Sequence, residues 1–214
     1  MIKRITLVTG DEGAADLRDA AAGALDAPPG VRPSRVAVST ALPGLTGPEP
    51  RHDGIGVEWF TDAGHLRRFE KWLGAPGNAP GSAPGPVLVA EESVMRGAAW
   101  LDRRWRDGGE KLKHMAVAVR AEGLTPAGFS ERWRGHSGRN IADQVKGLAY
   151  VQNHPVPRAT GQWAYDAVNE VYFDDIAGLR ARIEWFRENL PGPVRSDLFR
   201  ASWFLAVREE VLSA

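Results

Sequence analysis

The chain has no cysteine among its 214 residues. This absence excludes disulfides, metal sites built on thiolates and a cysteine nucleophile. Net charge is absent as well, because 27 lysines and arginines balance 27 aspartates and glutamates. A chain without net charge has no overall field to attract nucleic acid or an anionic membrane surface. We therefore expect neither of these as a partner.

Long apolar runs are also missing from the sequence. No stretch approaches the roughly 20 consecutive apolar residues that a membrane span needs. The opening segment MIKRITLVTG turns polar too early for a signal peptide. These two features predict a soluble, cytoplasmic protein.

The common cofactor motifs do not occur. There is no HExxH, no GxxxxGK and no GxGxxG that follows a strand, which argues against zinc, nucleotide and dinucleotide chemistry. We therefore expect no metal and no cofactor. Ligation of a haem by a single histidine is the alternative, and no second feature supports it.

Tryptophan, by contrast, is abundant, with eight residues. A cavity for a flat apolar ligand would use several tryptophans. Ordinary packing in the core is the alternative explanation. Histidine is scarce, and of the five we expect His52, His65 and His114 to be structural, because none has a partner in local spacing.

Two parts of the sequence resemble each other. IKRITLVT (2–9) is similar to LKHMAVAV (112–119), and each opens with a lysine, Lys3 or Lys113. A second pair of similar segments covers 52–73 and 165–186, and the offset changes only from 110 to 113 residues. We interpret this pattern as an internal duplication of about one hundred residues.

Each half has the same predicted order of elements. In the first half we expect a strand at 2–9, a helix at 14–25, strands at 34–41 and 54–60, a helix at 62–73 and a strand at 86–92. In the second half we expect a strand at 113–120, a helix at 125–136, strands at 147–154 and 164–173, a helix at 175–189 and a strand at 201–208. Both halves are therefore βαββαβ, the ferredoxin-like pattern of the α+β class. The predicted division is 1–95 for the first half, 96–111 for a helical connector and 112–214 for the second half.

A ferredoxin-like half covers one face of its sheet with helices and leaves the other face bare. Two such halves in one chain can pack their bare faces together into one α+β barrel, with the helices outside. The barrel then closes within one chain, so the protein is a monomer, or a homodimer that uses a different surface. A cavity between the two sheets is the expected ligand site.

The segment FSERWRGHSGRN (129–140) carries the first candidate residues. The spacing of Phe129, Trp133, His136 and Asn140 places them near one stripe of a helix. His136 thus points where the large apolar groups point, and a histidine can transfer protons near neutral pH.

Further candidates lie on the predicted strands. Glu170 is a carboxylate in the apolar run AVNEVYF, where it could form an acid/base couple with His136 or tie down a buried histidine or arginine. Alternation along 147–154 places Tyr150, Gln152 and His154 on one face and Asn153 on the other. Tyr150 could donate to a developing oxyanion, or it could be a half-buried tyrosine satisfied by the backbone.

Three segments together carry a family resemblance. GLTPAGFSERWRGHSGRN, GLAYVQNH and YDAVNEVYFDD resemble the EthD-like branch of the dimeric α+β barrel superfamily, over about 113–189. The first half departs from the pattern, because GDEGAADLRDAAAGALDAP has no W-x-x-H. In addition, Glu58 lies five residues after Asp53, whereas Glu170 lies four after Asp166. We interpret the first half as a degenerate copy that completes the barrel.

The resemblance implies cofactor-free chemistry on aromatic or polyketide-like substrates of secondary metabolism. We predict a small-molecule enzyme that uses a His/Glu pair for cyclisation, dehydration or isomerisation. The alternatives are a cofactor-free oxygenase and a non-catalytic metabolite-binding protein. The predicted catalytic residues are His136, Glu170 and Tyr150, which we expect to converge in the barrel cavity. The predicted substrate contacts are Trp133, Asn153, His154, Trp163, Asp166 and Trp203.

Overall fold

The structure is a computed structural model that describes residues 1–47, 50–76, 78, 85–109, 111–136, 141–158, 160–189 and 197–213, without the side chains of the terminal helix and strand residues 136 and 213. The elements of the first half are β1 (Ile2–Val8), α1 (Asp11–Gly23), β2 (Arg35–Ala41), β3 (Gly54–Phe60), α2 (Ala63–Leu73) and β4 (Val87–Arg96). Helix α3 (Ala98–Asp107) connects this half to β5 (Lys111–Arg120), α4 (Pro126–His136), β6 (Ala149–Pro155), β7 (Ala167–Phe173), α5 (Ile176–Asn189) and β8 (Phe199–Ser213). Both halves therefore have the predicted βαββαβ order.

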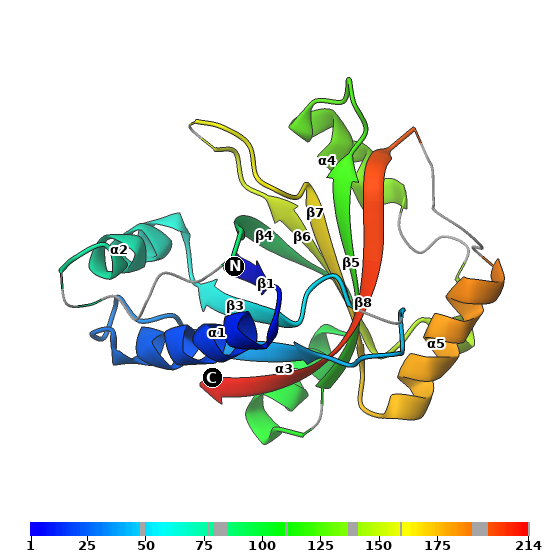
Figure 1. The fold of residues 1–214 in the computed structure, drawn as a ribbon, viewed down its shortest axis with the longest axis horizontal. Helices are drawn as coiled ribbons and strands as arrows, with labels where there is room; N and C mark the ends of the chain where they lie inside the picture. Colours follow the sequence, from blue (N-terminus) through cyan, green and yellow to red (C-terminus); the bar gives the residue numbers. More distant parts are fainter. Residues whose placement is uncertain are drawn as a thin grey trace.

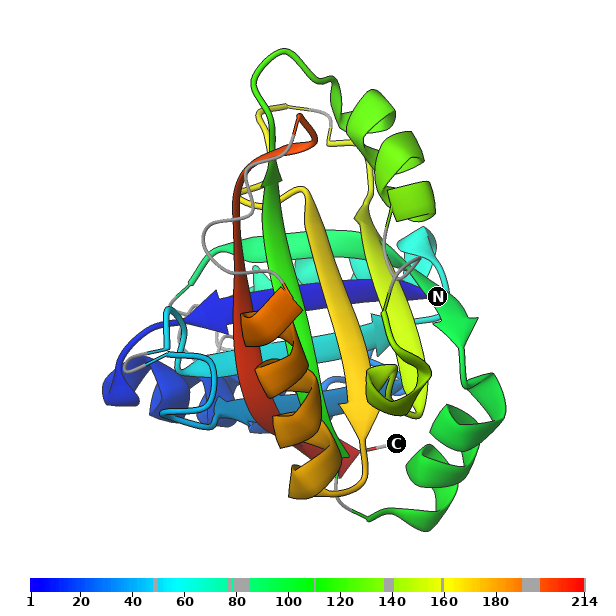
Figure 2. The same cartoon turned by 90° about the vertical axis from the view of Figure 1, so that its right-hand side faces the viewer.

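The eight strands form one closed antiparallel barrel. Its order is β1-β3-β2-β8-β5-β7-β6-β4, so β4 pairs with β6 and β2 pairs with β8 across the two halves. In Figure 2 the strands of the second half stand upright and cross those of the first. The predicted fold class is confirmed, and the barrel closes within one chain.

Three strands are longer than predicted. Strand β5 covers 111–120 instead of 113–120, and β4 and β8 cover 87–96 and 199–213 instead of 86–92 and 201–208. The added residues of β4 pair with β6, from Ser93 to Arg96. At the C-terminal end of β8 the added residues pair with β2, where Val36 lies opposite Ser213. The extensions of β4 and of this end of β8 are therefore stabilised by strands of the other half, which local sequence patterns do not report.

Helices α1, α2, α4 and α5 lie on the outside of the barrel (Figure 1). Helix α4 packs Phe129 and Trp133 against Ala118 and Ala167 of β5 and β7. Helix α5 packs Leu179 and Ile183 on the same sheet, and α1 and α2 cover the sheet of the first half. None of the described helices is long and apolar enough to cross a membrane.

The connector α3 lies against one end of the barrel. Its Trp105 packs against the interior cluster and meets the ring of Trp59 edge-on, with the centroids 5.2 Å apart. The turn from β4 into α3 requires Gly97, whose φ is +78° and whose added Cβ would lie 2.2 Å from the carbonyl oxygen of Leu148. The connector is thus held close to the start of β6.

A buried histidine joins α5 to the sheet. Arg182 donates from Nε to Nδ1 of His114 at 3.0 Å, and the His114 ring stacks on Phe204 at 4.8 Å. Burial, with a contribution from the Arg182 charge, holds the pKa of His114 well below its ordinary value of 6.5. The imidazole is therefore neutral in the folded protein, and it has the structural contacts of a packed histidine.

We expect His114→Gln to flatten the dependence of stability on pH. Below pH 6.5 the unfolded chain protonates this histidine and the folded protein does not, so wild-type stability falls as the pH falls through 6.5. The loss attributable to this group approaches about 1.4 kcal/mol per pH unit. Urea unfolding measures it over a range of about two pH units centred on the ordinary histidine pKa of about 6.5. Equal slopes for the two proteins would contradict the buried neutral state.

Candidate functional site

The predicted site residues lie in three separate places in the fold. Glu170 and Asn153 face the interior of the barrel. Trp133, Tyr150 and His154 lie with α4 on the outer face of β6 and β7. A further set, Trp163, Asp166 and Trp203, lies near the ends of the strands of the second half.

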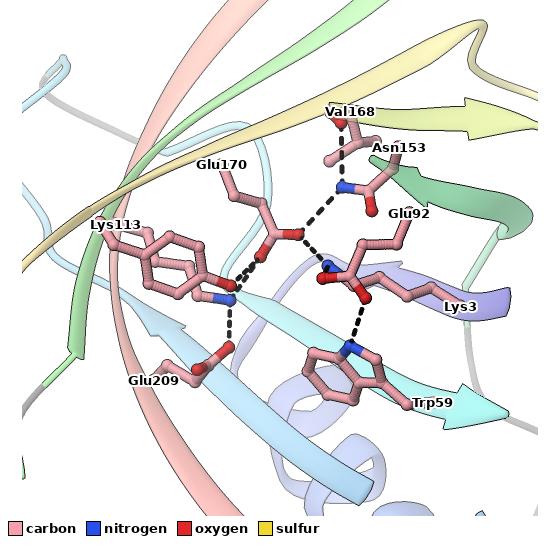
Figure 3. A network of polar contacts seen from close by, with 9 residues as sticks. Lys3, Trp59, Glu92, Lys113, Asn153, Val168, Glu170 and Glu209 are labelled. Carbon is pink, nitrogen blue, oxygen red and sulfur yellow. Dashed lines mark hydrogen bonds and ion pairs between the residues drawn. The ribbon is translucent and has the colours of Figure 1, made fainter. Parts of the chain in front are cut away.

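In the barrel interior, Glu170 is the centre of a buried polar network (Figure 3). Its carboxylate oxygens each lie 2.6 Å from an ammonium nitrogen, Oε1 from Lys3 and Oε2 from Lys113. Asn153 donates to Oε1 at 2.9 Å and the Tyr172 hydroxyl to Oε2 at 2.9 Å. Both lysines and Glu170 are fully buried.

Two more carboxylates complete this network, which we call the Glu170 network. Glu92 of β4 lies 3.4 Å from Lys3 and accepts a hydrogen bond from Trp59 Nε1 at 3.2 Å. Glu209 of β8 forms an ion pair with Lys113. Lys3 lies opposite Ala90, two residues before Glu92, and Lys113 lies opposite Val207, two residues before Glu209. The Lys3–Glu92 and Lys113–Glu209 pairs therefore occupy corresponding places in the two halves.

The charges around Glu170 define its protonation state. Burial alone would raise the pKa of its carboxyl, but Lys113 and Lys3 hold that pKa far below the ordinary value of 4.5. Burial and the neighbouring Glu170 raise the pKa of the Tyr172 phenol well above 10. Glu170 is therefore an anion near neutral pH and has little tendency to take up a proton. Glu170 therefore ties down buried cations, but these are two lysines and not the expected histidine or arginine.

The expected convergence of Glu170 and Tyr150 in one cavity is wrong. In the ladder between β6 and β7, Glu170 lies opposite Val151, and Tyr150 lies opposite Val171. Opposite residues share a face, so the two side chains lie on different faces of the sheet. Helix α4, which ends at His136, packs on the outer face; the His136 side chain itself lies outside the described part of the chain.

Sequence reasoning missed Lys3 and Lys113 as site residues. The signal was present, because both similar segments open with a lysine inside a β-rich, apolar run. A lysine in such a run is almost never fully buried unless it is paired. The partner could not be found from spacing, since Lys3 and Glu170 are 167 residues apart.

On the outer face, His154 and Tyr150 belong to one hydrogen-bonded chain. The His154 Nδ1 lies 3.2 Å from the Ser130 hydroxyl of α4, and its Nε2 lies 3.0 Å from Gln152 Oε1. Gln152 donates from Nε2 to the Tyr150 hydroxyl oxygen at 2.8 Å. Because the glutamine amide donates to Tyr150, its oxygen faces the histidine, which must then carry its proton on Nε2.

The same chain continues to the tryptophan of α4. Asn169 donates to the Tyr150 oxygen at 3.1 Å and accepts from Trp133 Nε1 at 3.2 Å. The Trp133 ring also stacks on Phe129, with centroids 5.5 Å apart and planes inclined by 20°. We call the chain from Ser130 to Trp133 the α4-face chain. It brings three of the predicted site residues together.

The pKa of His154 fits this arrangement. Burial lowers the pKa, and the charge of Arg134 lowers it further. The imidazole is thus neutral near pH 7, with Nδ1 free of a proton and able to accept from Ser130.

The third set is held mainly by structural contacts. Asp166 accepts from the backbone N–H of Arg120 at 2.9 Å and forms an ion pair with its guanidinium. Trp163 donates to the carbonyl oxygen of Val156 at 2.8 Å. Trp203 instead faces the end of the barrel interior, where its ring meets Tyr165 at 5.6 Å.

The first half offers no counterpart of Glu170. In the second half Lys113 lies opposite Tyr172, and Glu170 comes two residues before Tyr172. In the first half Lys3 lies opposite Trp59, so Val57, two residues before Trp59, occupies the place of Glu170. Glu58 lies on the outer face, paired with Arg4 at 2.6 Å beside a cavity of about 20 Å³. That volume accommodates about one water molecule. No group of three or more potential metal-ligating side chains occurs among the residues that the structure describes.

Comparisons with known proteins support the fold and nothing finer. No protein-family model matches the sequence, and neither does any curated protein. The chain is similar to a solved anthrone oxidase-like protein, with a TM-score of 0.55 and 11% identity, over 100% of this chain and 94% of that one. A protein from Lactobacillus acidophilus NCFM assigned as a monooxygenase gives a TM-score of 0.46 and 10% identity, over 99% and 95% of the two chains.

Proposed function

We propose that the protein is a cofactor-independent enzyme that transfers protons on a small aromatic, polyketide-like substrate between α4 and the outer face of β6 and β7. The observation that carries this proposal is the α4-face chain, in which a neutral histidine is linked through Gln152 to Tyr150. Such a chain of polar groups in a largely buried place is costly unless every member is satisfied. The chain also fixes the positions of His154 and Tyr150, two groups that can exchange protons.

Tyr150 is the proposed electrophilic group. Its oxygen accepts hydrogen bonds from Gln152 and Asn169 at 2.8 and 3.1 Å, and these donors hold the hydroxyl that carries the phenolic proton in place. In the complex this proton would be donated to a substrate carbonyl, whose negative charge develops as a neighbouring C–H bond breaks.

His136 is the proposed base, as the family resemblance implies. It ends the helix that covers this face, and it would take the proton that the substrate loses. His154 acts as a positioning residue, because its Nε2 proton orients Gln152, which in turn contacts Tyr150. Glu170 is not part of this proposal, since its carboxylate faces the barrel interior and is paired with two lysines.

The second candidate function is a cofactor-free oxygenase on the same face. The name of one solved structure of similar fold, an anthrone oxidase-like protein, makes anthrone a suitable probe. Enolisation of anthrone requires only proton transfer. Oxidation of anthrone to anthraquinone consumes one O₂ and releases one water, so oxygen uptake distinguishes the two reactions.

We expect wild-type protein to accelerate the enolisation of anthrone under nitrogen, and Tyr150→Phe to lower that rate about 10²- to 10³-fold, the usual effect of losing one oxyanion donor. Absorbance of the enol measures the rate, and thermal unfolding verifies that the variant is folded. Acceleration only in air, with matching oxygen uptake, would support the oxygenase. Binding of anthrone without acceleration of either reaction would contradict an enzyme and support a carrier.

A further inference from the structure

Three aromatic side chains meet at one end of the barrel interior, away from the α4 face. They are His52 of the segment before β3, Tyr165 of the segment before β7 and Trp203 of β8. The centroid of the His52 ring lies 6.0 Å from that of Tyr165 and 5.9 Å from that of Trp203. The guanidinium of Arg51 lies 3.9 Å from the centroid of Trp203. We call these four residues the His52 cluster.

The His52 cluster contains polar atoms without a partner. Both ring nitrogens of His52 and Nε1 of Trp203 are buried, and none makes a hydrogen bond with the part of the chain that the structure describes. Only 6% of His52 is exposed. Native proteins satisfy nearly all buried polar groups, so three such atoms in one place need an explanation. A ligand that supplies the missing hydrogen bonds is such an explanation.

The chemistry of these atoms limits the kind of ligand. Burial, and the charge of Arg51, lower the pKa of His52, so the imidazole is neutral near pH 7. One of its nitrogens then donates and the other accepts, while the Trp203 indole only donates. The cluster thus offers two donors and one acceptor, surrounded by aromatic rings.

A phenolic hydroxyl fits this set of atoms. It can accept a hydrogen bond from an N–H and donate its own proton to the bare nitrogen of His52. An ionised carboxylate accepts only and would leave that nitrogen unsatisfied. The ring of a phenol can lie against Tyr165 and Trp203, and the Arg51 cation favours the partial negative charge of the phenol oxygen.

We propose that the His52 cluster is a binding site for a small phenol, separate from the α4-face chain. The ligand would approach past Arg51, which is exposed, and Trp203, which is partly exposed. The two sites are on different sides of the sheet, because Trp203 packs against the interior cluster and Tyr150 packs with residues of the outer face. The proposal therefore does not depend on the proposed enzymatic activity.

Calorimetric titration of the full chain with p-nitrophenol, at a slightly acidic pH where most of this phenol keeps its proton, tests the site. We expect saturable binding to wild-type protein and an affinity about 10- to 100-fold lower for His52→Phe, which keeps a ring but removes both nitrogens. Trp203→Phe removes the indole donor and should also weaken binding. Trp185→Phe on α5 is the matched control and should bind as wild type does. p-Nitroanisole, whose methyl group replaces the phenolic proton, should bind about tenfold more weakly or worse.

A second measurement separates a ligand site from a structural role. If His52 serves a ligand, removing its unpartnered nitrogens should leave the melting temperature of the free protein unchanged or raise it. p-Nitrophenol should raise the melting temperature of wild-type protein but not that of His52→Phe.

Four results would overturn the proposal. They are no binding of p-nitrophenol by wild-type protein, equal binding by His52→Phe, equal binding of p-nitroanisole, and a large fall in melting temperature for His52→Phe. The last result would indicate that ordered water satisfies the histidine and that its role is structural. Loss of binding in His154→Gln but not in His52→Phe would place the phenol on the α4 face instead.

Discussion

Replacing Glu170 by glutamine is expected to lower the free energy of unfolding by about 3–5 kcal/mol. The substitution removes the charge that Lys3 and Lys113 share, and both ammonium groups are fully buried. Lys3 would keep only Glu92 and Lys113 only Glu209, and a buried charge that loses one of two partners carries more of the penalty of its removal from water. Because domains are stable by only about 5–15 kcal/mol, this loss would bring the protein close to unfolding.

Urea unfolding measures the effect, and Glu210→Gln is the matched control. Glu210 lies on β8 and pairs with Arg18, but both side chains are about half exposed. Exposed pairs contribute about 0–1 kcal/mol, so the control should remain close to wild type. A similar small effect for both variants would contradict the view that the Glu170 network stabilises the barrel.

The same network makes a prediction for acid pH. The pKa of Glu170 is depressed in the folded protein, so its contribution to stability is complete above the ordinary value of 4.5 and is lost as the pH falls below 4.5. The difference in stability between wild type and Glu170→Gln should therefore narrow below pH 4.5, by up to about 1.4 kcal/mol per pH unit. A constant difference down to the pH of acid unfolding would contradict the paired anion.

Replacing His136 by alanine is expected to lower turnover about 10²- to 10⁴-fold, the usual contribution of a general acid or base. The substitution removes the proposed proton acceptor but leaves the packing of Phe129 and Trp133 on the sheet in place. Enolisation of anthrone under nitrogen is the measurement.

His114→Gln is the control for this experiment, because it removes a histidine that joins α5 to the sheet and takes no part in the proposed chemistry. It should keep turnover near the wild-type value at pH 7.5, about one unit above the ordinary histidine pKa. Unchanged turnover in His136→Ala would show that His136 is not the base. Tyr150→Phe would then test whether the α4 face takes part in the reaction at all.

The sequence by itself determined the elements and their order. Helix starts depend on residues close in the chain, and side chains cap two of them. Asp62 accepts from the backbone N–H of His65 at 2.8 Å, and Thr125 accepts from that of Gly128 at 3.1 Å. Alternation correctly placed Tyr150 and His154 on one face, because the period of a strand is a local property. The βαββαβ repeat then limited the fold to a sheet with one bare face per half.

Only the tertiary structure decided which faces and which partners meet. The face of β7 that holds Glu170 depends on its register with β6, where a shift by one residue would turn Glu170 outward. Its cation Lys3 comes from the other half of the chain, and His52 meets Trp203 from a strand more than a hundred residues later. Contacts of this kind arise from the closure of the barrel, which brings distant strands together, and spacing along the chain holds no record of them.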